Sequence, residues 1–217
     1  MSRQVTVAQT NRPVIVTGVE DLSSRARLRD AAIRLFAERG VAGTSVRDIA
    51  EAAGVTAGLI THYYGSKERL KAEIDDLTVE VFTAPLAAQS DRSDQMPEAV
   101  AEALAHTMSA HADLRAYLRR SFLENDPASS EVFDRFVALM RDMLAEWRAA
   151  GVLRADLDMD WAPLQVLFLH FGPLLLGPAV ERILGIENYG DDVIRRRSRA
   201  HLELIERGFL SDPTTTP

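Results

Sequence analysis

The fold is decided by one stretch of the sequence, TSVRDIAEAAGVTAGLITHYYGSK, which runs from Thr44 to Lys67. Ser45 and Asp48 have the spacing of a capping box, in which both side chains accept hydrogen bonds from backbone N–H groups at a helix start. Gly54 supplies the backbone freedom of a helix C-terminal cap. The helix between them should begin at about Val46. It carries apolar residues at the spacing of one buried face: Val46, Ile49, Ala50 and Ala53.

A second short helix follows the turn at Gly54 and Val55. Thr56 is placed to cap it, and Ile60 with Tyr64 forms an i, i+4 pair suited to burial. Two short helices joined by a Gly-containing turn make a helix-turn-helix unit. Small residues and hydrogen-bonding tips remain on the exposed face of the second helix: Ala57, Gly58, Thr61, His62 and Tyr63. Such a face can approach base edges and phosphates closely.

The charge distribution separates this region from the rest of the chain. The 217 residues carry 25 Lys and Arg against 32 Asp and Glu, a net charge of -7. Residues 23–72 hold nine basic and five acidic side chains, a net of +4, whereas residues 73–217 carry -11. A basic headpiece on an acidic body is typical of phosphate binding at one defined site. This pattern weighs against a competing interpretation, in which the helical hairpin only packs within an all-helical domain.

Residues 23–72 as a whole resemble the DNA-binding domain of the TetR family of bacterial repressors. The resemblance rests on a first helix, SRARLRDAAIRLFAERG, followed by GTSVRDIAEAAGVTAGLITHYYGSKERL in one fixed register. It covers about 50 residues. The remaining chain resembles the family only in length and helical character, so the expected fold is all-α, with a three-helix DNA-binding domain and a larger helical domain for ligand binding and dimerisation.

The resemblance implies a role for each matching position. Ser45 and Arg47 would contact a phosphate or a base edge from the first helix of the motif, and Lys67 would bind a phosphate. The five exposed residues of the second helix would lie along the major groove. At Thr61, His62 and Tyr63 this sequence departs from the commonest family pattern of two aromatic residues followed by His. The base sequence of the operator therefore cannot be read from these residues.

Domain boundaries follow from the motif and from composition. We expect an N-terminal extension over residues 1–22, the DNA-binding domain over 23–72, the helical domain over 73–210 and a disordered tail over 211–217. The extension is either a disordered leader or an arm whose Arg3 and Arg12 touch the minor groove. The sequence contains no cysteine and no signal-peptide pattern. Both features favour a cytoplasmic protein without disulfides.

Start and stop signals predict the helices of the larger domain. They should span about 66–84, where Pro85 interrupts the helix, and then 97–110, 113–124, 128–150, 160–176 and 191–209. The segment Trp161–Leu176 is too short and too interrupted for a membrane span, yet too apolar for a surface helix. We expect it to be buried on nearly every side, with a second subunit covering part of it. The resemblance likewise implies a homodimer through the two C-terminal helices.

Candidate effector-pocket residues are apolar or isolated polar side chains of the larger domain: Met108, Met143, Trp147, Phe168, His170 and Phe171. They would suit a small apolar effector, because Met adapts to irregular ligands and His170 is a lone polar group in an apolar run. The simpler interpretation is that these residues form the core or a dimer contact. Glu102 and His106 have i, i+4 spacing and could share a metal, but no second pair lies nearby in the sequence.

Two classes of function remain at this point. One is a dimeric, sequence-specific transcriptional regulator, a repressor that a small-molecule effector releases from a palindromic DNA operator. The other is a small all-helical enzyme or metal-binding protein in which the helix-turn-helix only packs. An enzyme would need a nucleophile, base and orienting acid, or a metal cluster, and the sequence presents no such constellation. We therefore predict a regulator without catalytic residues, cofactor or bound metal.

Overall fold

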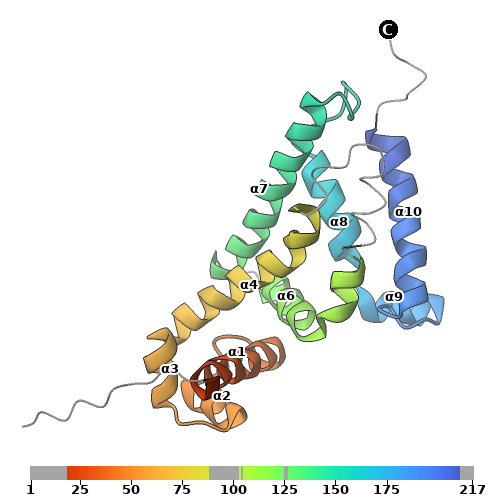
Figure 1. Cartoon of the computed structure of the whole chain (residues 1–217). Helices are drawn as coiled ribbons and strands as arrows, with labels where there is room; N and C mark the ends of the chain where they lie inside the picture. The colour runs from red at the N-terminus through yellow and green to blue at the C-terminus, as the bar shows by residue number, and fades with distance from the viewer. Residues whose placement is uncertain (1–18, 88–102, 104, 125–126, 211–217) are drawn as a thin grey trace, which may run out of the picture.

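A computed structural model describes residues 19–87, 103, 105–124 and 127–210 of the chain. Within these residues the secondary structure is helical apart from one isolated bridge between Leu153 and Leu210, which confirms the all-α fold class. The headpiece and the body are stacked end to end, and α4 runs from one into the other (Figure 1). The headpiece contains α1 (Val19–Arg39), α2 (Val46–Ala53) and α3 (Gly58–Tyr64).

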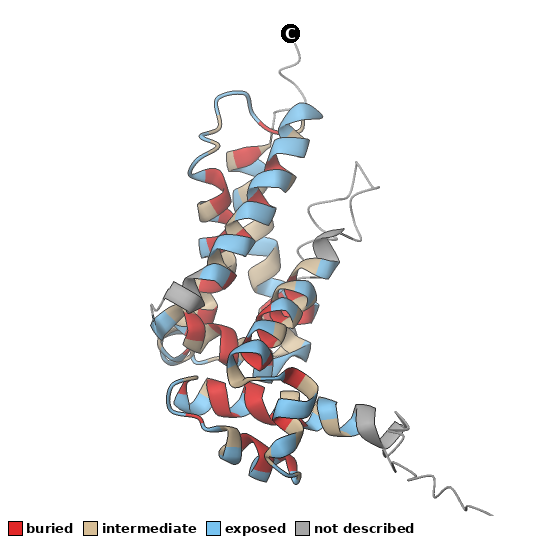
Figure 2. Cartoon of the chain, turned by 90° about the vertical axis from the view of Figure 1, so that its left-hand side faces the viewer, coloured by how far each residue is buried: buried red, intermediate tan, exposed pale blue. Residues whose placement is uncertain are grey.

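The headpiece folds around a small apolar core because each of its helices buries one face. Leu28, Ala32 and Phe36 of α1 are buried. They share the headpiece core with Ile49 of α2 and Ile60 of α3, as the sequence predicted. Burial of such side chains contributes about 1.5–3 kcal/mol each before conformational entropy is subtracted. The core continues without interruption into the body (Figure 2).

The start of α2 agrees with the sequence prediction, and the start of α3 does not. Ser45 and Asp48 form the reciprocal capping box, and Gly54 ends α2 with a φ of 66°. Thr56, in contrast, does not cap α3, so that prediction is wrong. Ala57 is the residue that precedes α3, and its backbone is already helical, without a side-chain hydrogen bond. The turn closes instead through the carbonyl of Thr56, which accepts from the N–H of Leu59 at 3.1 Å.

The helix α4 (Lys67–Ala87) leaves the headpiece and enters the body. The sequence predicted that Pro85 would interrupt this helix, but α4 continues to Ala87. A proline lacks only its own N–H, so near a helix end it removes a single backbone hydrogen bond. The predicted boundary was therefore too early. The first part of the predicted helix over residues 97–110 lies outside the described residues, as do the 1–18 part of the N-terminal extension and the tail.

The body contains α6 (Ala112–Glu124), α7 (Pro127–Ala149), α8 (Ala162–Leu175), α9 (Gly177–Leu184) and α10 (Asp191–Phe209). All of these except α9 agree with the predicted helices to within about two residues at each end. The sequence interpretation missed α9, a helix of eight residues that is followed by a C-terminal cap at Gly185, whose φ is 64°. α6 packs on α1 of the headpiece and on α7 and α8, so it joins the headpiece to the body.

The apolar segment of α8 is covered on only one side within a single chain. Val166, Leu167 and Phe171 are buried in the core. Trp161, which precedes α8, is 56% exposed and Phe168 is 54% exposed, so these side chains are left for the expected second subunit to cover. Among the described helices none alone has the length and hydropathy of a membrane span, and the pair α8 and α9 reaches them only together, with a bend of 74°.

Candidate nucleic-acid interface

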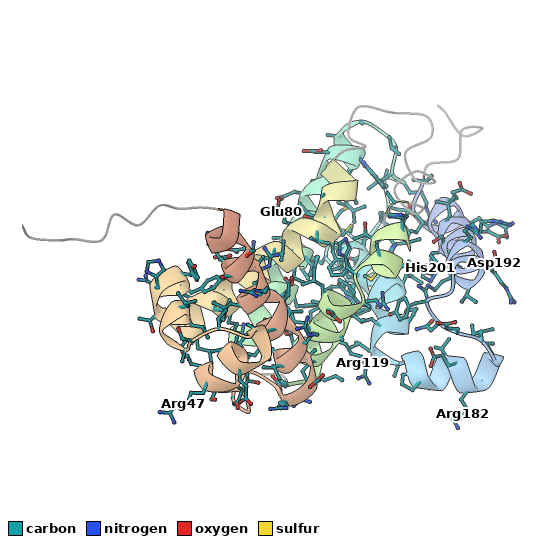
Figure 3. All side chains as sticks on the ribbon, turned by 60° about the horizontal axis from the view of Figure 1, so that its bottom comes forward. Arg47, Glu80, Arg119, Arg182, Asp192 and His201 are labelled. Carbon is teal, nitrogen blue, oxygen red and sulfur yellow. The ribbon has the colours of Figure 1, made fainter. Side chains whose placement is uncertain are left out.

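The start of α2 presents Ser45 and Arg47 at the end of the molecule farthest from the body. Both residues are exposed, and Figure 3 shows Arg47 projecting outward from the headpiece. The capping box fixes this end of the helix: the backbone N–H of Ser45 donates to the Asp48 carboxylate at 2.8 Å, and the Ser45 hydroxyl accepts from the N–H of Asp48 at 3.2 Å. These hydrogen bonds hold the pKa of Asp48 below its usual range. Arg47 is therefore presented from an ordered helical turn.

The outer face of α3 carries the remaining predicted contact residues. Gly58, Thr61 and His62 are exposed, whereas Ala57 and Tyr63 are half-buried. The ring of Tyr63 lies edge-on between those of His62 and Tyr64, at centroid distances of 4.9 and 6.5 Å. A Cβ on Gly58 would meet no atom within 4 Å, so the backbone here is open to close approach. Four of these five residues thus lie on one short helix, and Ala57 immediately precedes it.

Tyr64 anchors α3 to the rest of the headpiece. The side chain is buried, and its hydroxyl donates to the carbonyl of Arg25 at 2.7 Å. The Arg25 guanidinium lies over the Tyr64 ring and forms an ion pair with Glu73 of α4 at 2.6 Å. Burial raises the pKa of the Tyr64 phenol. This contact ties the predicted reading helix to α1 and α4 together.

Lys67 has a structural role that the sequence did not reveal. Its ammonium donates to the carbonyls of Val41 and Thr44, at 2.8 and 3.0 Å, and so ties the start of α4 to the loop between α1 and α2. The Thr44 hydroxyl in turn donates to the carbonyl of Gly40 at 2.8 Å. An ammonium has three N–H donors, so one of the Lys67 donors is not used by these carbonyls. The predicted phosphate contact of Lys67 is compatible with this geometry and stays a prediction.

Comparison with known proteins supports the same assignment of the headpiece. A family model described as bacterial regulatory proteins, tetR family, matches residues 28–74. The HTH-type transcriptional repressor Rv3405c of Mycobacterium tuberculosis is 30% identical over 188 residues, which cover 86% of this chain and 89% of that protein. The chain belongs to the TetR family of transcriptional regulators.

Two further comparisons agree with this membership. The HTH-type transcriptional regulatory protein RaaS of Mycobacterium tuberculosis is 35% identical over 138 residues, or 64% of this chain and 63% of RaaS. That match therefore spans less than two thirds of RaaS. The TetR family transcriptional regulator PfmR of Thermus thermophilus has the same fold, with a TM-score of 0.63, 23% identity and coverage of 87% of this chain and 98% of PfmR. The protein is thus a TetR-family DNA-binding regulator and not an enzyme.

The six predicted effector-pocket residues of this TetR-family regulator differ in burial, and their role in effector binding stays a prediction. Met108 and Phe171 are buried in the core, where the Phe171 ring contacts those of Phe122 and Phe136. Met143 and Trp147 pack partly buried against the core from α7. Phe168 is 54% exposed, although it lies only one turn before the buried Phe171 on α8.

The remaining polar candidates have different surroundings. The imidazole of His170 approaches the carbonyl of Val166 at 2.8 Å and packs edge-on against His201 of α10. Burial lowers the pKa of His170. Of the proposed metal pair, Glu102 lies outside the described residues. Within the part of the chain that the structure describes, no group of three His, Cys, Asp or Glu side chains could hold a metal ion.

Proposed function

We propose that this TetR-family regulator is a homodimeric repressor that binds a palindromic DNA operator through α2 and α3 and is released from it by a small-molecule effector. The observation that carries the proposal is the outward-facing surface formed by Ser45, Arg47, Gly58, Thr61 and His62, named here the reading surface. All five residues are exposed, although their two helices are anchored to a buried core. Arg is suited to bidentate contact with guanine and to phosphate, and small residues permit close approach to the groove.

Dimerisation is supported by apolar side chains that α8 and α10 leave exposed in one protomer. Trp161, which precedes α8, and Phe168 of α8 are each more than half exposed, and Leu204 of α10 is 59% exposed. Large apolar side chains gathered on neighbouring helices are typical of an interaction surface. A twofold interface there would cover them, and two headpieces would then read two half-sites of a symmetric operator.

Effector control is supported by the way in which the headpiece is joined to the body. α1 packs on α6, and α4 passes from the reading end into the body, so a change in the body can alter the position of the headpiece. A ligand shifts such an equilibrium only if it binds one arrangement more tightly than the other. The relative Rv3405c carries the name of a transcriptional repressor, and repression is the direction that we propose here.

The reading surface is tested by the variant Arg47→Ala. Operator DNA should be obtained by selection from random fragments, and its affinity measured by fluorescence anisotropy at one fixed salt concentration. We expect a loss of about tenfold or more, since one good base or phosphate contact contributes about 1–3 kcal/mol. Arg141→Ala is the matched control, because Arg141 is an exposed arginine on α7, in the body. Unchanged affinity of Arg47→Ala would show that the reading surface is misplaced.

A further inference from the structure

Three arginines of the body lie around one tyrosine without a carboxylate partner among the described residues. Arg115 and Arg119 project from α6, and Arg197 comes from α10. The guanidinium carbons of Arg115 and Arg197 lie 3.8 and 5.4 Å from the centre of the Tyr189 ring. The positive charge of Arg119 acts on Tyr189 as well, where it lowers the pKa of the phenol. None of the three arginines takes part in an ion pair among the residues that the structure describes.

The hydrogen bonds of these arginines leave most of their donors unused. Arg115 donates through Nη1 to the carbonyls of Met108 and Ser109. Arg197 also donates through Nη1, to the backbone carbonyl and the side-chain oxygen of Asn188 at 3.1 and 2.8 Å. The Nε of Arg119 is buried and has no hydrogen-bond partner among the described residues. A guanidinium carries five N–H donors, and a buried donor without a partner costs about 1–3 kcal/mol.

The charges of Arg115 and Arg197 also lack an ion-pair partner among the described residues. Burial lowers the pKa of both Arg115 and Arg197, and the charge of Arg115 lowers that of Arg197 further. A carboxylate nearby would act in the opposite direction, as Glu73 does when it raises the pKa of Arg25. Arginine nevertheless stays protonated in proteins. Arg115 and Arg197 therefore place two positive charges around Tyr189, and Arg119 adds a third one turn further along α6, so an anion between them would be stabilised.

A hollow that is lined in part by Arg119 could hold a ligand next to these positive charges. Its volume is about 360 Å³, within the range of small-molecule sites. Apolar groups of Ala37, Ala116 and Leu123 line it, together with Arg119 and the Arg120–Glu124 ion pair. Ala37 belongs to α1 and the other residues to α6, so the hollow lies at the contact between headpiece and body. Figure 3 shows Arg119 extending from α6 on the side of α9.

We propose that Arg115, Arg119 and Arg197 form a binding site for an amphipathic organic anion, whose carboxylate or phosphate head lies among the guanidiniums and whose apolar part occupies the hollow between α1 and α6. This site deepens the proposed effector control and rests on it for its biological role. The occupied hollow would contact the headpiece directly through Ala37. The ligand would therefore favour one position of α1 against α6.

The test uses three probes with the same eight-carbon chain: octanoate, octyl phosphate and octan-1-ol. Binding to the full-length protein is measured by isothermal titration calorimetry without DNA. We expect at least one anionic probe to bind at least tenfold more tightly than octan-1-ol, and the tighter of the two anions identifies the head group. Equal binding of all three probes, or no binding of either anion below 1 mM, would overturn the proposal. This comparison needs no variant and so cannot be confused with misfolding.

Variants then locate the site. Arg119→Gln should lower the affinity for the anionic probe at least tenfold, and Arg119→Lys should lower it less because the charge is kept. Arg141→Gln, which changes an exposed arginine on α7, should leave the affinity at the wild-type value. If Arg119→Gln bound the anion as tightly as the wild type, the arginines would not be the site. Operator affinity is measured separately without any probe. Failure of the anion site would thus leave DNA binding intact, whereas failure of the proposed regulator function would appear in the DNA titration.

Discussion

The ammonium of Lys67 joins two roles in one side chain. The family resemblance predicts that it contacts a DNA phosphate, and in the structure it donates hydrogen bonds to the carbonyls of Val41 and Thr44. A cation at the first turn of α4 therefore stabilises the loop that precedes the reading surface. Local sequence could not predict this role, because Val41 lies 26 residues away from Lys67. The position of Lys67 was predictable, and its partners were not.

Lys67→Ala should consequently lower both DNA affinity and folding stability. We expect the free energy of unfolding to fall by about 2 kcal/mol, since hydrogen bonds from a charged donor contribute about 1.5–3 kcal/mol. The slope of log affinity against log salt should fall by about one. Urea denaturation and salt-dependent DNA titration measure the two effects. Arg69→Ala is the control, because this exposed cation on the same turn should change stability by less than about 0.5 kcal/mol. Equal stability of the two variants would exclude the structural role of Lys67.

His201 should make the stability of the protein depend on pH. Burial, with smaller contributions from His170 and Arg197, lowers the pKa of His201 from 6.5 to about 4. Between these values the unfolded chain binds a proton that the folded chain does not bind. The free energy of unfolding should therefore fall as the pH decreases from about 6.5 towards 4, and this contribution should end below about 4.

The variant His201→Gln isolates this contribution. Its loss of stability between pH 6.5 and pH 5, measured by chemical denaturation, should be smaller than that of the wild type. Carboxylates titrate mainly below this range, so the difference between the two proteins reports the histidine. Parallel curves for the two proteins would show that His201 is accessible to protons in the folded state.

Among the helices, those with local signals at their ends were the most predictable. α2 begins and ends as expected because its capping box and Gly54 lie within three residues of its boundaries. α9 was missed although Pro178 lies in its first turn and Gly185 follows its end, because eight residues are too few to show a repeated helical period in the sequence. The arginine site joins α6 to α10, and no sequence periodicity connects helices so far apart.

The contact between α1 and α6 depends on Gly40. Its φ is 76°, and a Cβ at this position would collide with the carboxylate of Glu124. Gly40→Ala should therefore destabilise the protein somewhat more than Gly54→Ala, because the exposed Glu124 carboxylate must shift away from the new methyl group, whereas Gly54 has a similar φ of 66° and no atom within 4 Å of a Cβ. Positive φ alone costs a side chain about 1–2 kcal/mol.

Thermal or urea unfolding of these variants measures the difference. The additional loss for Gly40→Ala should largely disappear in a Glu124→Ala background, because the colliding carboxylate is then absent. If Gly40→Ala and Gly54→Ala were equally destabilised, displacement of the Glu124 carboxylate would have no measurable cost, which would contradict this prediction.

For the entire protein, the headpiece that carries the reading surface lies at one end, and α8 and α10, which carry exposed apolar side chains, lie in the body (Figure 1). Family membership and helical character were predictable from about 50 residues of the headpiece. The exposure of α8 could not be predicted from the sequence, because it depends on which faces of α8 the other helices cover. The exposed face of α8 is the feature that most directly suggests a partner subunit.

Phe168→Glu should prevent the proposed dimer. Phe168 is 54% exposed in the protomer, so the charge costs little in the monomer but would be buried without a partner in the interface. We expect sedimentation velocity at micromolar concentration to show a dimer for the wild type and a monomer for the variant. Asp142→Glu is the control, because Asp142 is exposed on α7. A wild-type monomer, or a fully dimeric Phe168→Glu variant, would contradict the proposed interface.

Selection of bound fragments from random DNA, followed by sequencing, examines specific reading and symmetry together. A dimer with two identical reading surfaces should enrich an inverted repeat whose half-site centres lie about one helical turn of DNA, or a multiple of it, apart. The Arg47→Ala variant should fail to enrich the same repeat at the same salt concentration. Recovery of fragments without a shared sequence, or with a single unrepeated site, would contradict a dimeric regulator that reads DNA through α2 and α3.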